Sequence, residues 1–179
     1  MSKWDYSKSL EYVKCGLCGA DDTRLVTIED SFKIVRCKRC GLTYLNPRPR
    51  EEDLLEFYND FFLTDEESIS QWSRLMGRVY EETKRNIERE YSSGKILDMG
   101  CGLGLFLKLW DPKKWALFGI DISEKAVRYA RSKGLNVRRG SLEKTDFSDD
   151  YFDVITMFYV LEHLPHPREV LKEARRILK

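Results

Sequence analysis

The fold is decided by the stretch Ile96-Leu97-Asp98-Met99-Gly100-Cys101-Gly102-Leu103-Gly104. A short apolar run closes on an acid, Asp98, and glycine then occupies alternate positions. This pattern predicts a buried strand, a glycine turn and a helix that begins near Leu103. Glycine adopts positive φ and lets a ligand approach the main chain without meeting a Cβ. A strand that leads through such a turn is a typical site for a nucleotide-like ligand.

From residue 95 onward, apolar strands alternate with amphipathic helices. Ser123 is a sound N-cap, and Gly134 stands where the C-terminus of a helix favours glycine. The pattern predicts an α/β fold: a Rossmann-like parallel sheet of about four strands with helices on both faces. Strands are expected at 95–99, 116–120, 136–138 and 152–157, and helices at 103–110, 123–133 and 168–178.

Four of the five cysteines form two Cys-x-x-Cys pairs, each followed by glycine. The chain has no signal-peptide core and no apolar run of about 20 residues, so we expect a cytoplasmic protein. There, this spacing indicates a structural four-thiolate zinc site between two hairpin strands, 24–28 and 32–36. Reduced cysteines without metal, or rubredoxin-like iron, are the alternatives. The predicted ligands are Cys15, Cys18, Cys37 and Cys40.

Three domains are expected. Residues 1–46 form a zinc-ribbon module, 47–91 a helical connector or lid, and 92–179 a partial Rossmann-like domain. The connector should hold a short helix, 50–57, and a long amphipathic one, 70–91, which either packs on the sheet or covers a ligand. Residues 1–50 carry 10 Lys+Arg against 6 Asp+Glu, weaker than a typical nucleic-acid footprint.

The glycine turn does not fit a dinucleotide or a triphosphate. Leu105 stands where the dinucleotide fingerprint requires its last glycine, and no Lys-Ser/Thr pair follows. Asp98 and Asp121 both end strands at the ligand side of the predicted sheet. Asp121 suits two ribose hydroxyls and Asp98 suits a cation. A nucleoside that carries a sulfonium and an amino acid would therefore fit both.

Residues 95–179 resemble class I S-adenosylmethionine-dependent methyltransferases. The motifs that carry the resemblance are the opening stretch, Gly119–Ser123, and the run from Phe152 to Pro165. With the cysteine pairs, the whole chain resembles a subgroup that has an N-terminal zinc ribbon. The resemblance implies methyl transfer from S-adenosylmethionine to an unidentified acceptor, with a small molecule favoured. RNA or protein methylation that uses the ribbon for recognition, or a non-catalytic module that binds S-adenosylmethionine and zinc, are the alternatives.

The resemblance also implies a cofactor site. The glycines line the methionine moiety, Asp98 anchors its amine, and Asp121 holds the ribose hydroxyls. The family often has Gly-Asp-Ala after the third strand, so Ser141 is a departure, although the Leu142 backbone could contact adenine. The implied residues are Asp98, Gly100, Gly102, Gly104, Asp121, Ile122, Ser141, Leu142 and Phe158.

His163 follows the fourth predicted strand, where a general base could reach the acceptor. A hydrogen bond that orders the loop is the interpretation we favour for it. The familiar methyltransferase sheet has more strands, and this chain ends where a fifth should begin. We therefore expect a C-terminally truncated fragment; a naturally short protein is the alternative. The fourth strand would then offer an open edge, through which a dimer could form.

Overall fold

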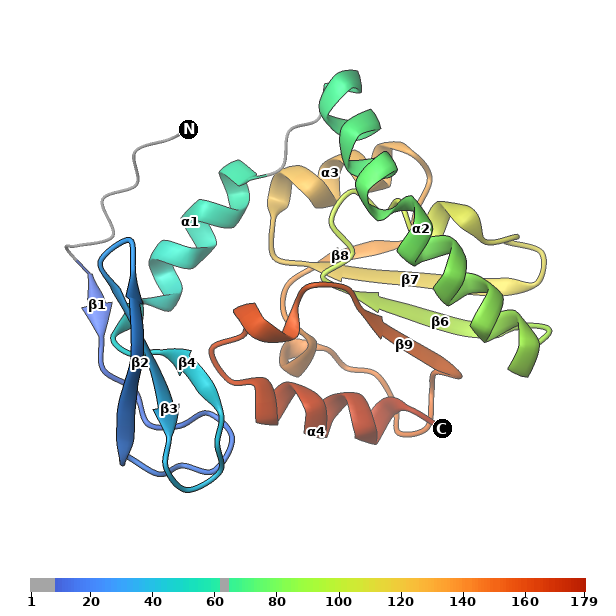
Figure 1. Cartoon of the computed structure of the whole chain (residues 1–179). Coiled ribbons are helices and arrows are strands. Elements are labelled where there is room, and N and C mark those ends of the chain that lie inside the picture. The colour runs from blue at the N-terminus through green and yellow to red at the C-terminus, as the bar shows by residue number, and fades with distance from the viewer. Residues whose placement is uncertain (1–8, 62–64) are drawn as a thin grey trace. The chain divides into compact units, whose positions relative to one another are not determined.

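The computed structural model of the chain describes residues 9–61 and 65–179 (Figure 1). The described residues divide into two compact units. The first is the chain up to Glu56 together with Pro165–Arg168, and the second is Phe57–Leu164 with Glu169–Lys179.

The first unit is built from short antiparallel strands. The predicted hairpin is confirmed, because β2 (Thr23–Glu29) pairs with β3 (Phe32–Cys37). A third strand, β4 (Thr43–Leu45), extends the sheet in the order β2-β3-β4. β4 was not predicted, because three residues are too few for an alternating pattern to stand out. Two further strands, β1 (Leu10–Glu11) and β5 (Arg48–Pro49), pair with each other, and α1 (Glu51–Phe61) follows.

The second unit contains the predicted Rossmann-like sheet. Its four strands are parallel and lie in the order β8-β7-β6-β9, so the strand order reverses beside β6, the first of the four along the chain. Figure 1 shows their arrowheads at one edge of the sheet. The bounds are β6 Gly94–Met99, β7 Trp115–Asp121, β8 Val137–Arg139 and β9 Val154–Met157.

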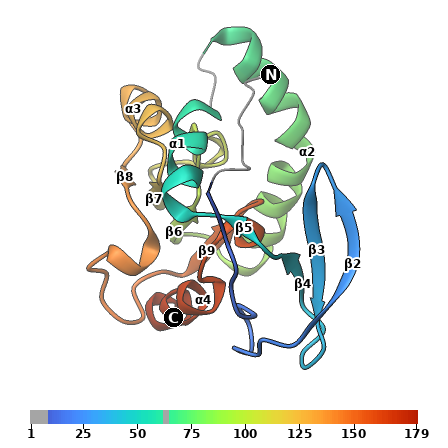
Figure 2. The same ribbon diagram turned by 90° about the vertical axis from the view of Figure 1, so that its left-hand side faces the viewer.

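Alternating side chains of β6 supply both faces of this sheet. Ile96 belongs to a core cluster that also includes Val127 and Ala130 of α3 (Glu124–Ser132), with Ile87 of α2 (Glu66–Glu90) packed against it. Leu97 belongs to the opposite cluster, with Val170 and Ala174 of α4 (Pro167–Ile177). Figure 2 shows α2 and α3 on one side of the row of strands and α4 on the other.

Helix boundaries follow the local signals. Ser123 caps α3 through a hydrogen bond from the Ala126 N–H, and Gly134 follows the helix at φ +80°. The long helix α2 begins four residues before the predicted Ser70, because the Asp65 side chain accepts a hydrogen bond from the Ser68 N–H and caps it there.

The helix predicted over 103–110 is wrong. The segment forms turns and one short 3-10 helix, Leu107–Leu109. Gly104 adopts φ +72°, which no helix contains, and Pro112 bars helix from the residue before it. The large side chains that suggested a helix recur at the spacing of one helical face, and all four are buried although the backbone is not α-helical: Leu103, Phe106, Leu107 and Trp110.

β9 is an edge strand of the described sheet. Before it, Phe152 forms an isolated parallel bridge with Leu178, and the Lys179 N–H donates to the Phe152 carbonyl at 3.0 Å. Strand pairing therefore begins at Val154 rather than at the predicted Phe152. Among the described residues, no helix is both long enough and apolar enough to cross a membrane.

Candidate functional site

The parallel topology gathers the predicted ligand-binding residues at the carboxyl edge of the sheet. Asp98 is the penultimate residue of β6, and Asp121 is the last residue of β7. The glycine turn follows β6 directly. Ligands of open α/β sheets bind at this edge, where the strand order reverses. In this sheet β6 lies between β7 and β9, so the reversal falls at Asp98.

The glycine turn requires glycine for two reasons. Gly100, Gly102 and Gly104 have φ values of +68°, +51° and +72°, where other residues are strained. A Cβ on Gly100 would also lie 2.3 Å from a methyl group of Val160. The Gly100 and Cys101 N–H groups both donate to the Ile120 carbonyl, at 2.7 and 3.1 Å. Because no α-helix follows the turn, no helix dipole is available there for a polyphosphate.

Asp121 fastens the turn to β7. Its carboxylate accepts hydrogen bonds from the Gly102 N–H at 2.7 Å and the Ser123 N–H at 2.8 Å. Asp121 is only 6% exposed. Burial raises the pKa of Asp121, while these backbone N–H groups act in the opposite direction. A carboxylate offers about four acceptor positions, so two remain for a ligand with a pair of hydroxyls.

Asp98 is buried and is held from the neighbouring strand. The Thr156 hydroxyl of β9 donates to the Asp98 carboxylate at 2.7 Å, and the two residues are paired in the strand register. Burial raises the pKa of Asp98 to about 7; the charge of Asp121 acts in the same direction and the Thr156 bond opposes it. Thr156 is the site residue that sequence reasoning missed. Its signal is a polar side chain inside the apolar run Val154–Met157.

Two buried carboxylates therefore lie close enough at this edge for the charge of Asp121 to raise the pKa of Asp98. Among residues 9–61 and 65–179, no ion pair involves Asp98 or Asp121. Buried acids of this kind take up protons or bind a positive group. The arrangement thus favours a ligand that brings its own positive charge and hydroxyl groups.

The other predicted contacts lie around the same edge. Ile122 is half-buried after β7, and Ser141 is half-buried after β8. The Leu142 side chain is fully buried in the core, so only its backbone is free for a ligand. Phe158 packs against Tyr80 of α2 and Phe106, with ring centroids 4.9 and 4.8 Å apart. α2 therefore contacts the residues that follow β6 and β9.

His163 lies in a short 3-10 helix, Leu161–His163, and is exposed. Its backbone N–H donates to the Val160 carbonyl at 2.9 Å. Its ring lies edge-on to the Tyr58 ring, with the ring centroids 5.8 Å apart. The His163 side chain is therefore not packed into the buried site of Asp98 and Asp121.

The four predicted metal ligands converge in the first unit. The Cys15 and Cys40 sulfurs lie 3.4 Å apart, the Cys18 and Cys37 sulfurs 3.6 Å apart, and all four within 4.8 Å of one another. A tetrahedral zinc site with Zn–S bonds of about 2.3 Å needs sulfurs about 3.8 Å apart. Among the described residues these four alone form such a cluster, and their geometry fits zinc.

Local backbone geometry prepares these thiols. The glycine after each pair takes positive φ, +72° at Gly19 and +81° at Gly41, so each turn closes tightly around its sulfurs. Backbone N–H groups of Cys40 and Arg39 lower the pKa of the Cys37 thiol to about 7. A thiolate is the form of cysteine that binds metal, so this turn favours the competent state at Cys37, whereas burial and the neighbouring thiols raise the pKa of Cys40.

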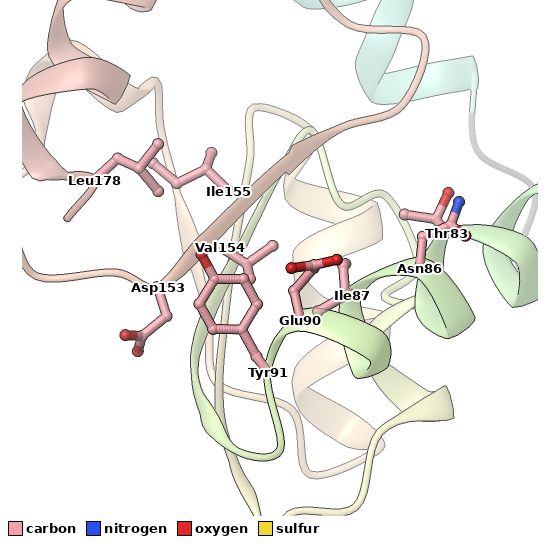
Figure 3. Close-up of a pocket in the computed structure, with 9 residues that line it drawn as sticks. All are labelled: Thr83, Asn86, Ile87, Glu90, Tyr91, Asp153, Val154, Ile155 and Leu178. Atoms are coloured by element: carbon pink, nitrogen blue, oxygen red, sulfur yellow. The ribbon is translucent and has the colours of Figure 1, made fainter.

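A separate apolar cavity of about 410 Å³ lies at the opposite end of β9 (Figure 3). The last turns of α2 and the start of β9 form its walls, and Ile87 and Val154 belong to its lining. None of the predicted site residues lines it, so it is distinct from the carboxyl edge.

Residues 97–179 match the family model described as a methyltransferase domain. The matched residues include the strands of the parallel sheet and the acid-flanked glycine turn, so this part of the chain is similar to methyltransferase domains in both sequence and architecture. The match does not include the cysteine pairs.

The chain is also similar to characterised and uncharacterised proteins. It is 34% identical over 92 residues to a ubiquinone biosynthesis O-methyltransferase of Thiobacillus denitrificans, covering 48% of this chain and 40% of that protein. It is 29% identical over 113 residues to an uncharacterised protein of Methanocaldococcus jannaschii, covering 63% and 53%. The chain thus spans about half the length, or less, of these curated relatives.

A solved structure supports the fold. The crystal structure of an S-adenosylmethionine-dependent methyltransferase from Thermotoga maritima has 26% sequence identity and a TM-score of 0.51. The similarity covers 72% of this chain and 56% of that one.

Proposed function

We propose that the protein of which this chain is part transfers a methyl group from S-adenosylmethionine to a small-molecule acceptor. The observation that carries the proposal is the pair of buried carboxylates, Asp98 and Asp121, beside a glycine turn and without a cation among the described residues. S-adenosylmethionine carries an ammonium group, a sulfonium and two ribose hydroxyls, which complement this arrangement.

Each acid has a separate role in the proposal. Asp121 already fastens the turn through Gly102, and its remaining acceptor positions receive the ribose hydroxyls. Asp98, oriented by Thr156, receives the ammonium group. The methionine chain lies along the glycine turn, and Ile122 supports adenine. Ser141, the Leu142 backbone and Phe158 complete the proposed contacts.

S-adenosylmethionine supplies an electrophilic methyl group whose transfer leaves a neutral thioether. The protein then has no leaving group to protonate, and its residues act by alignment and by exclusion of water. Asp98 and Asp121 hold two ends of the ligand, which fixes the direction of the sulfonium. An acceptor with a weakly acidic proton needs a base as well; His163 remains the candidate, although it is exposed.

The acceptor is proposed only by class. Similar proteins include the ubiquinone biosynthesis O-methyltransferase and a phosphatidylethanolamine N-methyltransferase of Cereibacter sphaeroides, so the matched region serves both oxygen and nitrogen acceptors in those proteins. In the first unit we propose one structural zinc ion, held by Cys15, Cys18, Cys37 and Cys40. Cytoplasmic location and a dimer through the β9 edge remain predictions.

Calorimetric titration with S-adenosylhomocysteine tests the cofactor proposal. We expect one site per chain, and Asp121→Asn should weaken binding at least about 100-fold, since two charge-assisted hydrogen bonds are weakened together. Asp146→Asn is the control, because Asp146 is exposed and pairs with the surface residue Arg138. Binding by Asp121→Asn at the wild-type affinity would contradict the proposed site, as would preferential binding of a nicotinamide dinucleotide.

A further inference from the structure

The Tyr44 hydroxyl is buried and has no hydrogen-bond partner among the described residues. Tyr44 lies on β4, directly opposite Val35 of β3. Cys37 lies two residues beyond Val35 on the same strand, and alternate residues of a strand share a face. The unpartnered hydroxyl therefore belongs to the face of the sheet that carries a predicted zinc ligand.

The Tyr44 hydroxyl lies within electrostatic reach of the cysteine cluster. Burial raises the pKa of Tyr44, and Cys15, Cys37, Asp21 and Cys18 act in the same direction. The hydroxyl thus keeps its proton and is available as a donor. A buried donor without an acceptor is unfavourable, so a hydroxyl on the sheet face that carries Cys37, and near Cys15, requires an explanation.

Zinc loading supplies the acceptor. A protonated thiol accepts hydrogen bonds weakly, whereas four thiolates around one Zn²⁺ carry excess negative charge on their sulfurs. We propose that Tyr44 is a positioning residue of the zinc site, donating its hydroxyl hydrogen bond to a metal-bound thiolate of Cys15 or Cys37. This inference rests on the proposed zinc site. Groups outside the ligand set commonly tune metal affinity in this manner.

The test compares Tyr44→Phe with Tyr12→Phe in the full chain. Both variants keep the ring and lose a hydroxyl, but Tyr12 is 77% exposed. Competition with a chromophoric chelator should show zinc affinity reduced about 5- to 20-fold in Tyr44→Phe and unchanged in Tyr12→Phe. In the cobalt-substituted protein, the sulfur-to-metal charge-transfer band should move to lower energy only in Tyr44→Phe, because a thiolate without its hydrogen bond is more easily oxidised.

A measurement on the unsubstituted chain completes the test. In the ¹¹³Cd-loaded protein, the Tyr44 hydroxyl proton should exchange slowly and show scalar coupling to the metal through the hydrogen bond. Wild-type protein that binds zinc, with an unshifted cobalt band in Tyr44→Phe and no such coupling, would overturn the role of Tyr44 alone. Wild-type protein that binds no metal would overturn the zinc site itself and this role with it.

Discussion

The two units of this chain obtain their order in different ways. In the sheet unit, two clusters of apolar side chains are packed on opposite faces of four parallel strands. In the ribbon unit, nearly every side chain of β2 is exposed, and the buried hydrophobic residues in the part of the unit that the structure describes are Val35 and two candidate ligands, Cys15 and Cys37. A module with so small a core needs a cross-link such as a structural metal, and here the candidate metal ligands also form most of the buried core. Burial thus stabilises one unit, and we infer that metal stabilises the other.

Cys37→Ser should produce the largest difference between the units. Loss of one thiolate should release zinc and unfold the ribbon, because metal binding supplies most of its folding free energy. Hydrogen exchange followed by mass spectrometry should show full loss of protection in residues 23–45 and unchanged protection in β6 and β7. Cys101→Ser should keep its zinc, since Cys101 lies outside the cluster. A ribbon that stays protected after chelation of its metal would show that its small core suffices.

Asp98 should make the sheet unit respond to pH without any metal. Its pKa is raised from 3.8 to about 7, so the folded state holds a proton that the unfolded state releases. The stability contributed by this proton is complete below about pH 4 and is lost as pH rises to about 7. Three pKa units correspond to at most about 4 kcal/mol.

Urea unfolding of the unliganded protein between pH 4 and pH 8 measures this effect. Other groups titrate as well, so the difference between wild type and Asp98→Asn isolates Asp98. That difference should grow with pH in favour of the variant. S-adenosylhomocysteine should bind the wild type more tightly as pH rises through 7, because the ammonium needs an ionised partner. Parallel pH profiles for wild type and variant would contradict the buried titration.

Substitutions at two glycines of the sheet unit distinguish the effect of backbone strain from the effect of side-chain packing. Gly100 and Gly134 have similar φ values, +68° and +80°, but only Gly100 has a neighbour, Val160, in the space of a Cβ. Gly134→Ala should lower the free energy of unfolding by about 1 kcal/mol through strain alone. Gly100→Ala should lower it by about 2–4 kcal/mol, since the branched Val160 side chain must also move. Equal losses in the free energy of unfolding by urea would mean that Val160 moves aside from the new Cβ at no cost.

Local sequence signals predicted most of the fold. Strand–helix alternation fixed the parallel sheet, and Ser123 and Gly134 placed the ends of α3 closely. The Cys-x-x-Cys spacing located the cysteine cluster for a similar reason, because each pair is a self-contained turn. These features depend on neighbours in the chain, which a sequence displays directly.

Features that depend on distant partners were not predictable in this way. Thr156 orients Asp98 across 58 residues of sequence, and only the strand register brings them together. The segment 103–110 has the apolar content of a helix, but its side chains are enclosed by elements that the sequence does not place around it. The proposed role of the Tyr44 hydroxyl likewise depends on its position near the cysteine cluster in the folded unit. Long-range contacts decided the roles of Thr156 and Tyr44, whereas the departure of 103–110 from a helix is marked locally by the positive φ of Gly104.

His163→Ala should have the smallest effect, because this histidine is exposed and outside both the metal cluster and the buried acids. Loss of its edge-on contact with the Tyr58 ring should lower the free energy of unfolding by about 0.5–1 kcal/mol. His166→Ala, also exposed, should change stability less, and both variants should bind S-adenosylhomocysteine within about twofold of wild type. A large loss of cofactor affinity in His163→Ala alone would place this side chain in the binding site. Once an acceptor is identified, unaltered turnover by the same variant in the complete enzyme would exclude His163 as the general base, leaving alignment by Asp98 and Asp121 as the main contribution of the described residues.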